Sequence, residues 1–79
     1  MSRLTVYSRE DCPLCEELLA ELLPWADERG FAVQIIDVDS DPQLLRRYGL
    51  KVPLVDWSGE TVCFGHLDLL ALKTITRSA

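Results

Sequence analysis

The sequence has few basic residues, no long apolar run and a single histidine. Its 79 residues include 8 Lys and Arg against 13 Asp and Glu, which gives a formal net charge of -5. A nucleic-acid surface needs a basic patch, so we expect no nucleic-acid partner. No stretch reaches the length of a membrane span, and the first residues lack the apolar segment of a secretory signal. We therefore expect no membrane association and a cytoplasmic location.

Cysteine is also scarce, and its count is odd. The three cysteines are Cys12, Cys15 and Cys63. A secreted disulfide scaffold of this length normally carries an even set, whereas cytoplasmic thiols are kept reduced. The length predicts one domain over residues 1–79 with a thin core, because a chain this short buries only about 60% of its unfolded surface. We expect a monomer with no bound cofactor.

The pattern of apolar and turn residues predicts an α/β fold. Apolar segments predict four strands, apolar stripes at helical spacing predict three helices, and the order is β-α-β-α-β-β-α. A strand, a helix and a strand imply a parallel pair, and the short connection Ser58-Gly59-Glu60 implies an antiparallel hairpin, so the four-stranded sheet should be mixed. The strands are expected in residues 3–7, 31–39, 52–57 and 61–65, and the helices in 13–29, 40–49 and 66–75.

Two further predictions concern the first helix and the second strand. Pro24 lies inside the first helical pattern, and it predicts a kink or break near Leu23 because proline removes a helix hydrogen bond. The segment 31–39, "FAVQIIDVD", is almost continuously apolar. That composition predicts a strand covered on both faces.

Cys12 and Cys15 stand where the first strand passes into the first helix. Unpaired N–H groups and the helix dipole favour negative charge there, and such a position lowers a thiol pKa from about 8.5 toward about 7. Cys15 lies one turn further on and should be less exposed. We predict that Cys12 attacks a disulfide and that Cys15 resolves the mixed disulfide. Arg9 favours the Cys12 thiolate, and four acidic neighbours oppose it: Glu10, Asp11, Glu16 and Glu17.

Two other interpretations of the cysteines stay open. Cys12 and Cys15 with Cys63 and His66 have the composition of a Cys₃His zinc site, which would make the chain a zinc-stabilised interaction module. Strand alternation places Cys63 on the same face as Thr61, and a free cysteine in a strand is often a small buried apolar side chain. The chain is alternatively an inactive scaffold that only binds a partner. The redox interpretation is favoured, because a lone pair in a β-α-β context is often redox-active.

Three segments resemble the glutaredoxins of the thioredoxin-like superfamily, and most closely their small, divergent bacterial members. They are "VYSREDCPLC", "VPLV" and "FGHLDLL". The resemblance covers nearly the whole chain. It implies a thioredoxin-like fold and thiol-disulfide oxidoreductase activity, with a disulfide-containing protein or glutathione as the partner.

The resemblance also implies a set of substrate-binding residues. The proline that opens the third strand is cis in this superfamily and faces the cysteine pair, which corresponds to Pro53 after Val52. The chain departs from the usual pattern at Leu14, where an aromatic residue is common, at Phe64, where a first glycine is common, and at Leu67, which replaces a polar residue. The implied set is Arg9, Pro13, Leu14, Val52, Pro53, Gly65 and Asp68.

Overall fold

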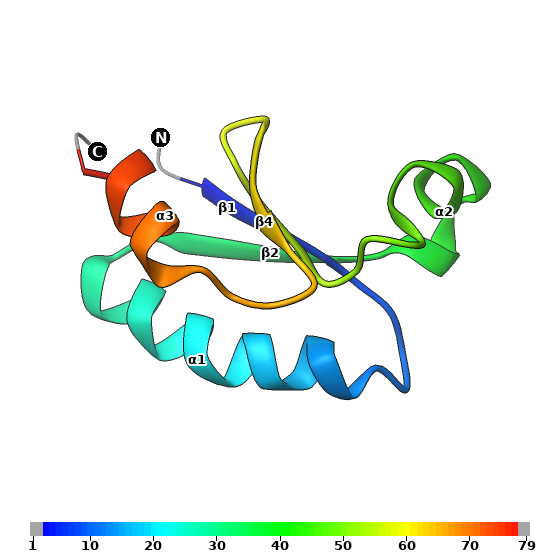
Figure 1. Cartoon of the computed structure of the whole chain (residues 1–79), viewed down its shortest axis with the longest axis horizontal. Helices are drawn as coiled ribbons and strands as arrows, with labels where there is room; N and C mark the ends of the chain where they lie inside the picture. Colours follow the sequence, from blue (N-terminus) through cyan, green and yellow to red (C-terminus); the bar gives the residue numbers. More distant parts are fainter. Residues whose placement is uncertain (1–2, 78–79) are drawn as a thin grey trace.

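The computed structural model describes residues 3–77, and these form a four-stranded mixed sheet with three α-helices (Figure 1). The order β-α-β-α-β-β-α predicted from the sequence is confirmed. The strands are β1 (Arg3–Ser8), β2 (Ala32–Asp37), β3 (Leu54–Trp57) and β4 (Glu60–Phe64). The helices are α1 (Pro13–Arg29), α2 (Pro42–Tyr48) and α3 (Leu69–Ile75), and a 3-10 turn, η1 (Val38–Ser40), precedes α2.

The strand order in the sheet is β2-β1-β3-β4. β1 pairs in parallel with β2 and antiparallel with β3, so the predicted crossover and mixed sheet are both present. The hairpin between β3 and β4 turns at Ser58 and Gly59, which have φ values of 51° and 90°. Two successive residues with positive φ are typical of the tight turns that match strand twist. Because β1 and β2 are parallel, their carboxyl ends lie at the same edge of the sheet.

Helix α1 runs through Pro24 without interruption, so, of the predicted kink or break near Leu23, the break is wrong. Leu22 precedes this proline, and Trp25 and Ala26 follow it, and all three side chains are buried. Packing against the sheet on both sides of Pro24 therefore offsets the hydrogen bond that the proline removes. The helix ends at Gly30, whose φ of 72° places it in the left-handed region that glycine adopts at helix ends.

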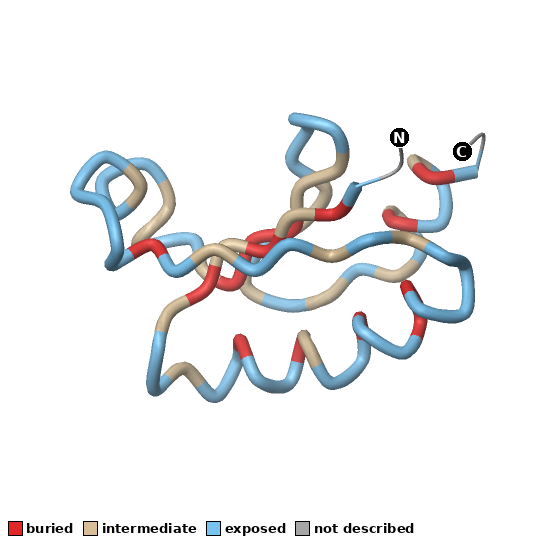
Figure 2. Tube along the Cα trace, turned by 180° about the vertical axis from the view of Figure 1, so that it is seen from behind, coloured by how far each residue is buried: buried red, intermediate tan, exposed pale blue. Residues whose placement is uncertain are grey.

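The core lies between one face of the sheet and the helices α1 and α3. The tube in Figure 2 shows buried positions on the side of α1 that faces the strands. Large side chains from the central strands meet one side of α1 and one residue of α3. The buried cluster comprises Leu4, Val6, Leu18, Leu22, Trp25, Ala26, Val55 and Leu72.

Strand β2 is an edge strand and is largely exposed, so the predicted strand covered on both faces is wrong. Ile35 is 50% exposed. The apolar composition does not require two covered faces, because a β-branched side chain also suits a half-buried strand. Only the part of β2 near Val33 packs against the core.

Helix α2 begins two residues later than the predicted segment 40–49, with Asp41 as its N-cap and Pro42 in its first turn. None of its residues is buried. Its tyrosine, Tyr48, stacks on Tyr7 of β1, with ring centroids 4.1 Å apart. Tyr7 alternates with the core residues Leu4 and Val6, so this stack lies on the sheet face opposite α1. Within residues 3–77, no helix is long and apolar enough to cross a membrane.

Candidate active site

Cys12 and Cys15 are joined by a disulfide at the start of α1. Their Cα atoms are 5.2 Å apart, a usual separation for a disulfide. Cys12 is the N-cap residue and has an extended backbone, whereas Cys15 lies in the first helical turn. Asp11 precedes them with a φ of 53°, so a tight turn leads from β1 into the helix. The structure thus brings the two predicted cysteines together.

The two sulfurs have different surroundings. Cys12 is partly exposed, whereas Cys15 is 2% exposed and belongs to the buried side of α1. The backbone N–H of Cys15 donates a hydrogen bond to the Sγ of Cys12, with an N–S distance of 3.2 Å. This N–H is one of the first-turn groups that have no partner within the helix. One sulfur is therefore accessible and contacts a helix N–H group, and the other is shielded.

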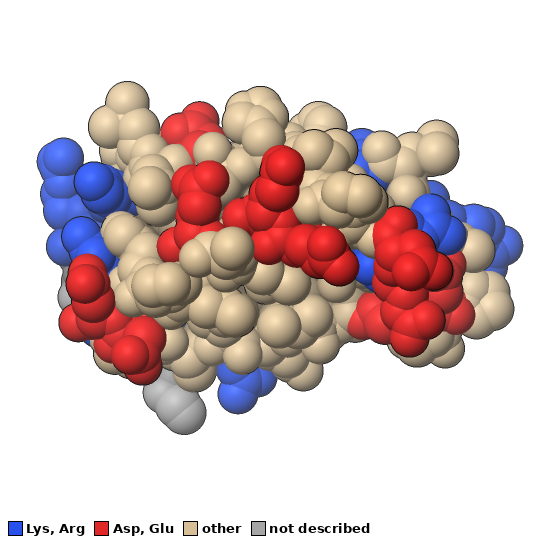
Figure 3. All heavy atoms as spheres, turned by 90° about the horizontal axis from the view of Figure 1, so that it is seen from below, with Lys and Arg blue, Asp and Glu red and all other residues tan. Residues whose placement is uncertain are grey.

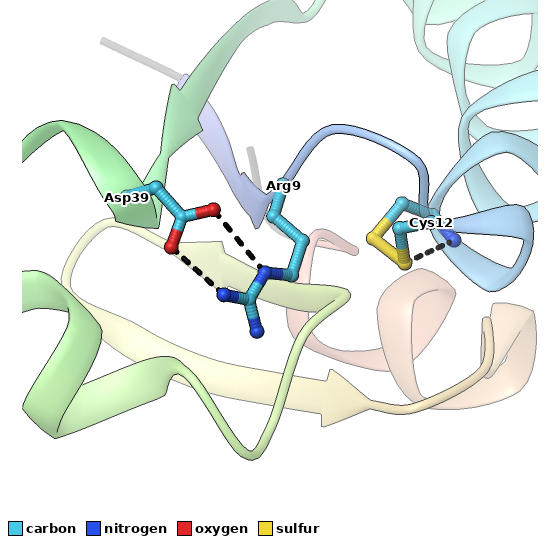
Figure 4. The surroundings of a disulfide bond; sticks show 4 residues. Arg9, Cys12 and Asp39 are labelled. Carbon is cyan, nitrogen blue, oxygen red and sulfur yellow. Dashed lines mark hydrogen bonds and ion pairs between the residues drawn. A yellow bond between two sulfur atoms is a disulfide. The ribbon is translucent and has the colours of Figure 1, made fainter.

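Arg9 lies at the end of β1, between the strand and the cysteines. Its guanidinium forms a two-pronged ion pair with Asp39 of η1, at 2.8 Å from Nη2 to Oδ1 and 3.3 Å from Nε to Oδ2. Figure 4 shows the guanidinium pointing toward Asp39 and away from the disulfide. Both side chains are partly exposed to solvent, at 38% and 42%.

Sequence reasoning missed Asp39, although a signal for it was present. Arg9 follows β1 and Asp39 follows β2, and the carboxyl ends of parallel neighbours meet at one edge of the sheet. Residues thirty positions apart in the sequence therefore become neighbours. The acidic run Asp37 to Asp41 at this edge was the sequence feature that indicated a partner for Arg9.

The Val52–Pro53 peptide bond is cis. Pro53 is buried and Val52 is partly exposed. The N–H of Gly65 donates a hydrogen bond of 2.7 Å to the carbonyl oxygen of Pro53. Within residues 3–77, the backbone N–H and carbonyl groups of Val52 have no backbone partner.

A small hollow of about 120 Å³ lies between α1 and the segment that follows β4. Leu14, which lies between the two cysteines, is 53% exposed and forms one wall. Gly65 forms part of another wall, and it is bonded to Pro53. Of the predicted residues, Leu14 and Gly65 line this hollow and Pro53 is bonded to Gly65, whereas Pro13 lies between the two cysteines in the chain. The remaining walls are Glu17, Leu18, Glu21, His66 and Leu67.

A larger hollow lies elsewhere, with a volume of about 590 Å³. It is lined by Arg29, the last residue of α1, together with Phe31 and residues of α3. The cysteines are at the first turn of α1, so this hollow is at the opposite end of the helix. It has no part in the chemistry of the disulfide.

Asp68 serves as the N-cap of α3, and its carboxylate accepts a hydrogen bond of 3.0 Å from the N–H of Ala71. It also lies near Cys63. Burial raises the pKa of the Cys63 thiol, the charge of Asp68 adds to that rise, and a hydrogen bond with the Asp68 backbone acts against it.

The structure does not assemble the alternative zinc site. Within residues 3–77, no three His, Cys, Asp or Glu side chains come together as a metal site. Cys63 pairs with Val55 of β3 and packs against the core. The register slips between Val55 and Asp56, so Thr61 pairs with Asp56 and Val62 is an extra residue in β4. This bulge interrupts the alternation and places Cys63 and Thr61 on opposite faces, which corrects the expectation that they share one.

The geometry agrees with comparisons to other proteins. The family model "Glutaredoxin-like domain (DUF836)" matches residues 3–75. Protein Ne2328 from Nitrosomonas europaea has 30% identity and a TM-score of 0.83, over 94% of this chain and 89% of that chain. Protein XcR50 from X. campestris has 34% identity and a TM-score of 0.72, over 96% of this chain and 97% of that chain. A comparison with curated proteins gave no match.

More distant structures agree on the fold. The oxidised thioredoxin of Plasmodium falciparum has 15% identity and a TM-score of 0.63, over 98% of this chain and 79% of that chain. At that identity the likeness shows a thioredoxin-like fold and nothing finer. Together with the family match over residues 3–75 and the cysteine pair at the start of α1, these findings show that the chain belongs to the glutaredoxin-like domain family.

Proposed function

We propose that the protein is a thiol-disulfide oxidoreductase in which Cys12 attacks the substrate and Cys15 resolves the intermediate. The observation that carries this proposal is the asymmetry of the pair. Cys12 is partly exposed at the start of α1, and Cys15 is shielded but close enough to form a disulfide with it. An accessible nucleophile beside a shielded partner suits a reversible exchange.

The reaction starts from the reduced protein and balances as follows. The Cys12 thiolate attacks one sulfur of the substrate disulfide, and the other substrate sulfur leaves as a thiolate that takes up a proton. The Cys15 thiolate then attacks the Sγ of Cys12 and releases the second substrate thiol. The protein dithiol loses two electrons and becomes the disulfide, and the substrate gains them. A cellular thiol reductant restores the dithiol.

The residues around Cys12 have separable tasks in this scheme. The N–H of Cys15, which contacts the Cys12 sulfur, stabilises the thiolate by a hydrogen bond and by the helix dipole. The free backbone groups of Val52 take a substrate backbone in extended form, as a strand pairs with a sheet edge. Leu14 and Gly65 border the approach to Cys12. The partner is a disulfide-containing protein or glutathione, and a dithiol of this kind suits the reducing cytoplasm.

Three variants of the isolated protein test the assignment. Cys12→Ser should abolish reduction of a small aromatic disulfide, and Cys15→Ser should accumulate a mixed disulfide on Cys12 that mass spectrometry detects. Cys63→Ser is the control, and it should reduce the disulfide at the rate of the unaltered protein. Full activity in Cys12→Ser would refute the role of Cys12. If only Cys63→Ser lost activity, the reacting thiol would be that of Cys63 and not that of Cys12.

A further inference from the structure

The charged residues around the disulfide are strongly unbalanced. Arg9 is the only Lys or Arg between residues 4 and 28, whereas Glu10, Asp11, Glu16 and Glu17 lie within five residues of Cys12. These four carboxylates are exposed, and we call them the acidic rim. In Figure 3, Asp and Glu side chains follow the α1 side of the molecule and form a dense group at its right-hand end, with Lys or Arg side chains next to that group.

The basic residue of this stretch, Arg9, already has a partner. The guanidinium of Arg9 is held by both carboxylate oxygens of Asp39. Asp39 is itself fixed, because its N–H donates a hydrogen bond of 2.9 Å to the carboxylate of Asp37. The Nε and Nη2 groups of Arg9 are therefore occupied and its charge is offset by a carboxylate that is positioned in advance, so Arg9 attracts an incoming carboxylate less strongly than a free arginine would.

The loop that precedes β3 also offers little attraction for an anionic substrate. Lys51 precedes Val52, and its ammonium lies over the ring of Phe64, 5.7 Å from the centroid. Leu14, between the two cysteines, is 53% exposed, and Phe64, the last residue of β4, is 52% exposed. The surface near Cys12 is therefore apolar at its centre and negative at its edge.

We propose, on the basis of the proposed function, that this site reduces disulfides in cationic polypeptides and that the Arg9–Asp39 pair turns anionic disulfides away. A segment with lysine or arginine beside its cysteines is attracted by the acidic rim, and its apolar side chains can pack on Leu14 and Phe64. Glutathione carries more carboxylates than ammonium groups, so it meets repulsion from the acidic rim. Asp39 is a positioning residue in this proposal, since it acts on substrates through Arg9.

The test uses two short synthetic peptides with the same intramolecular disulfide, one flanked by lysine and the other by glutamate. Pre-reduced protein is mixed with each peptide, and mass spectrometry follows peptide reduction in a single turnover. Each rate is divided by the rate with dithiothreitol, a neutral reductant, which removes differences in intrinsic reactivity. We expect the lysine peptide to react at least about tenfold faster at low salt, and the ratio to fall toward one at about 0.5 M salt.

Single substitutions distinguish the effect of the Arg9–Asp39 ion pair from the effect of a change in net charge. Asp39→Asn frees Arg9 and should lower the ratio, mainly by accelerating the glutamate peptide, whereas Asp39→Glu should preserve the ratio. Glu60→Gln is the matched control with the same change of charge. Glu60 pairs with Trp57, which pairs with Leu4 at the end of β1 remote from the disulfide. This control should change the ratio by less than about twofold.

The outcomes are distinguishable. Equal normalised rates for the two peptides would overturn the charge preference and leave the oxidoreductase assignment standing. A preference for the lysine peptide that Asp39→Asn does not alter would overturn the role of the ion pair. Failure of the reduced protein to act on either peptide would overturn this inference together with the proposed function. A salt-sensitive ratio that Asp39→Asn lowers and Glu60→Gln does not would support both parts.

Discussion

The N–H of Gly65 donates a hydrogen bond to the carbonyl oxygen of Pro53, which ties the segment after β4 to the loop before β3. Gly65 has a φ of 82°, and a Cβ added there would meet no atom within 4 Å. The cost of a side chain is therefore conformational and not steric. We expect Gly65→Ala to lower the free energy of unfolding by about 1–2 kcal/mol in urea titrations, and Gly65→Asn to lower it less. An alanine variant as stable as the original would contradict this account.

Pro24 leaves the carbonyl of Ala20 without its helical partner, although α1 continues through it. Pro24→Ala restores a backbone N–H at an exposed position. It also raises the conformational entropy of the unfolded chain, which partly opposes the gain in stability. We expect a net gain of about 1–3 kcal/mol in the free energy of unfolding, measured by chemical denaturation. Pro42→Ala is the matched control, because Pro42 opens α2 where proline fits, and it should give no gain. A gain from both substitutions alike would argue against a missing hydrogen bond as the cause.

Asp56 lies on the inner strand β3, and one of its carboxylate oxygens is buried without a hydrogen-bond partner. Burial raises the pKa of this carboxyl, a hydrogen bond from the Trp57 backbone lowers it, and the charge of Glu60 raises it further. The folded protein therefore binds the Asp56 proton more tightly than the unfolded chain does. The stabilising effect of protonation is fully present below the ordinary pKa of 3.8, and it is lost as pH rises through the raised value.

We accordingly expect Asp56→Asn to be more stable than the original protein at pH 7, and the difference to shrink as pH falls toward 3. Urea titrations at several pH values between 3 and 7 measure it. The amide has nearly the same shape, so packing is largely kept. A stability difference that does not change with pH would show that ionisation of Asp56 is not its source.

In the reduced protein, the Cys63 thiol should react with an alkylating agent more slowly than the Cys12 thiol. Burial raises the pKa of the Cys63 thiol, so little thiolate is present at pH 8, and the side chain packs against the core. Peptide mapping after brief treatment with iodoacetamide should find Cys12 modified well before Cys63. The same treatment in concentrated urea should modify both at similar rates. Faster labelling of Cys63 in the folded protein would conflict with its packed position.

Local patterns were sufficient for most of the fold. The element order and the hairpin at Ser58 and Gly59 follow from residues close in sequence. Two predictions failed, the break near Pro24 and the strand covered on both faces, because long-range packing decides both features. The helix continues through Pro24 because Trp25 and Ala26 pack on the sheet, and β2 is exposed because no strand or helix lies beyond it.

The sequence by itself determined that Cys12 and Cys15 lie one helical turn apart at a strand-to-helix junction, because helix spacing and proline placement are local. Only the tertiary structure decided that Arg9 is held by Asp39, that Gly65 bonds to Pro53, and that a bulge turns Cys63 away from the face of Thr61. Those relationships depend on which strand ends meet at one edge of the sheet and on how two strands slip in register. Neither is encoded in any short stretch of residues.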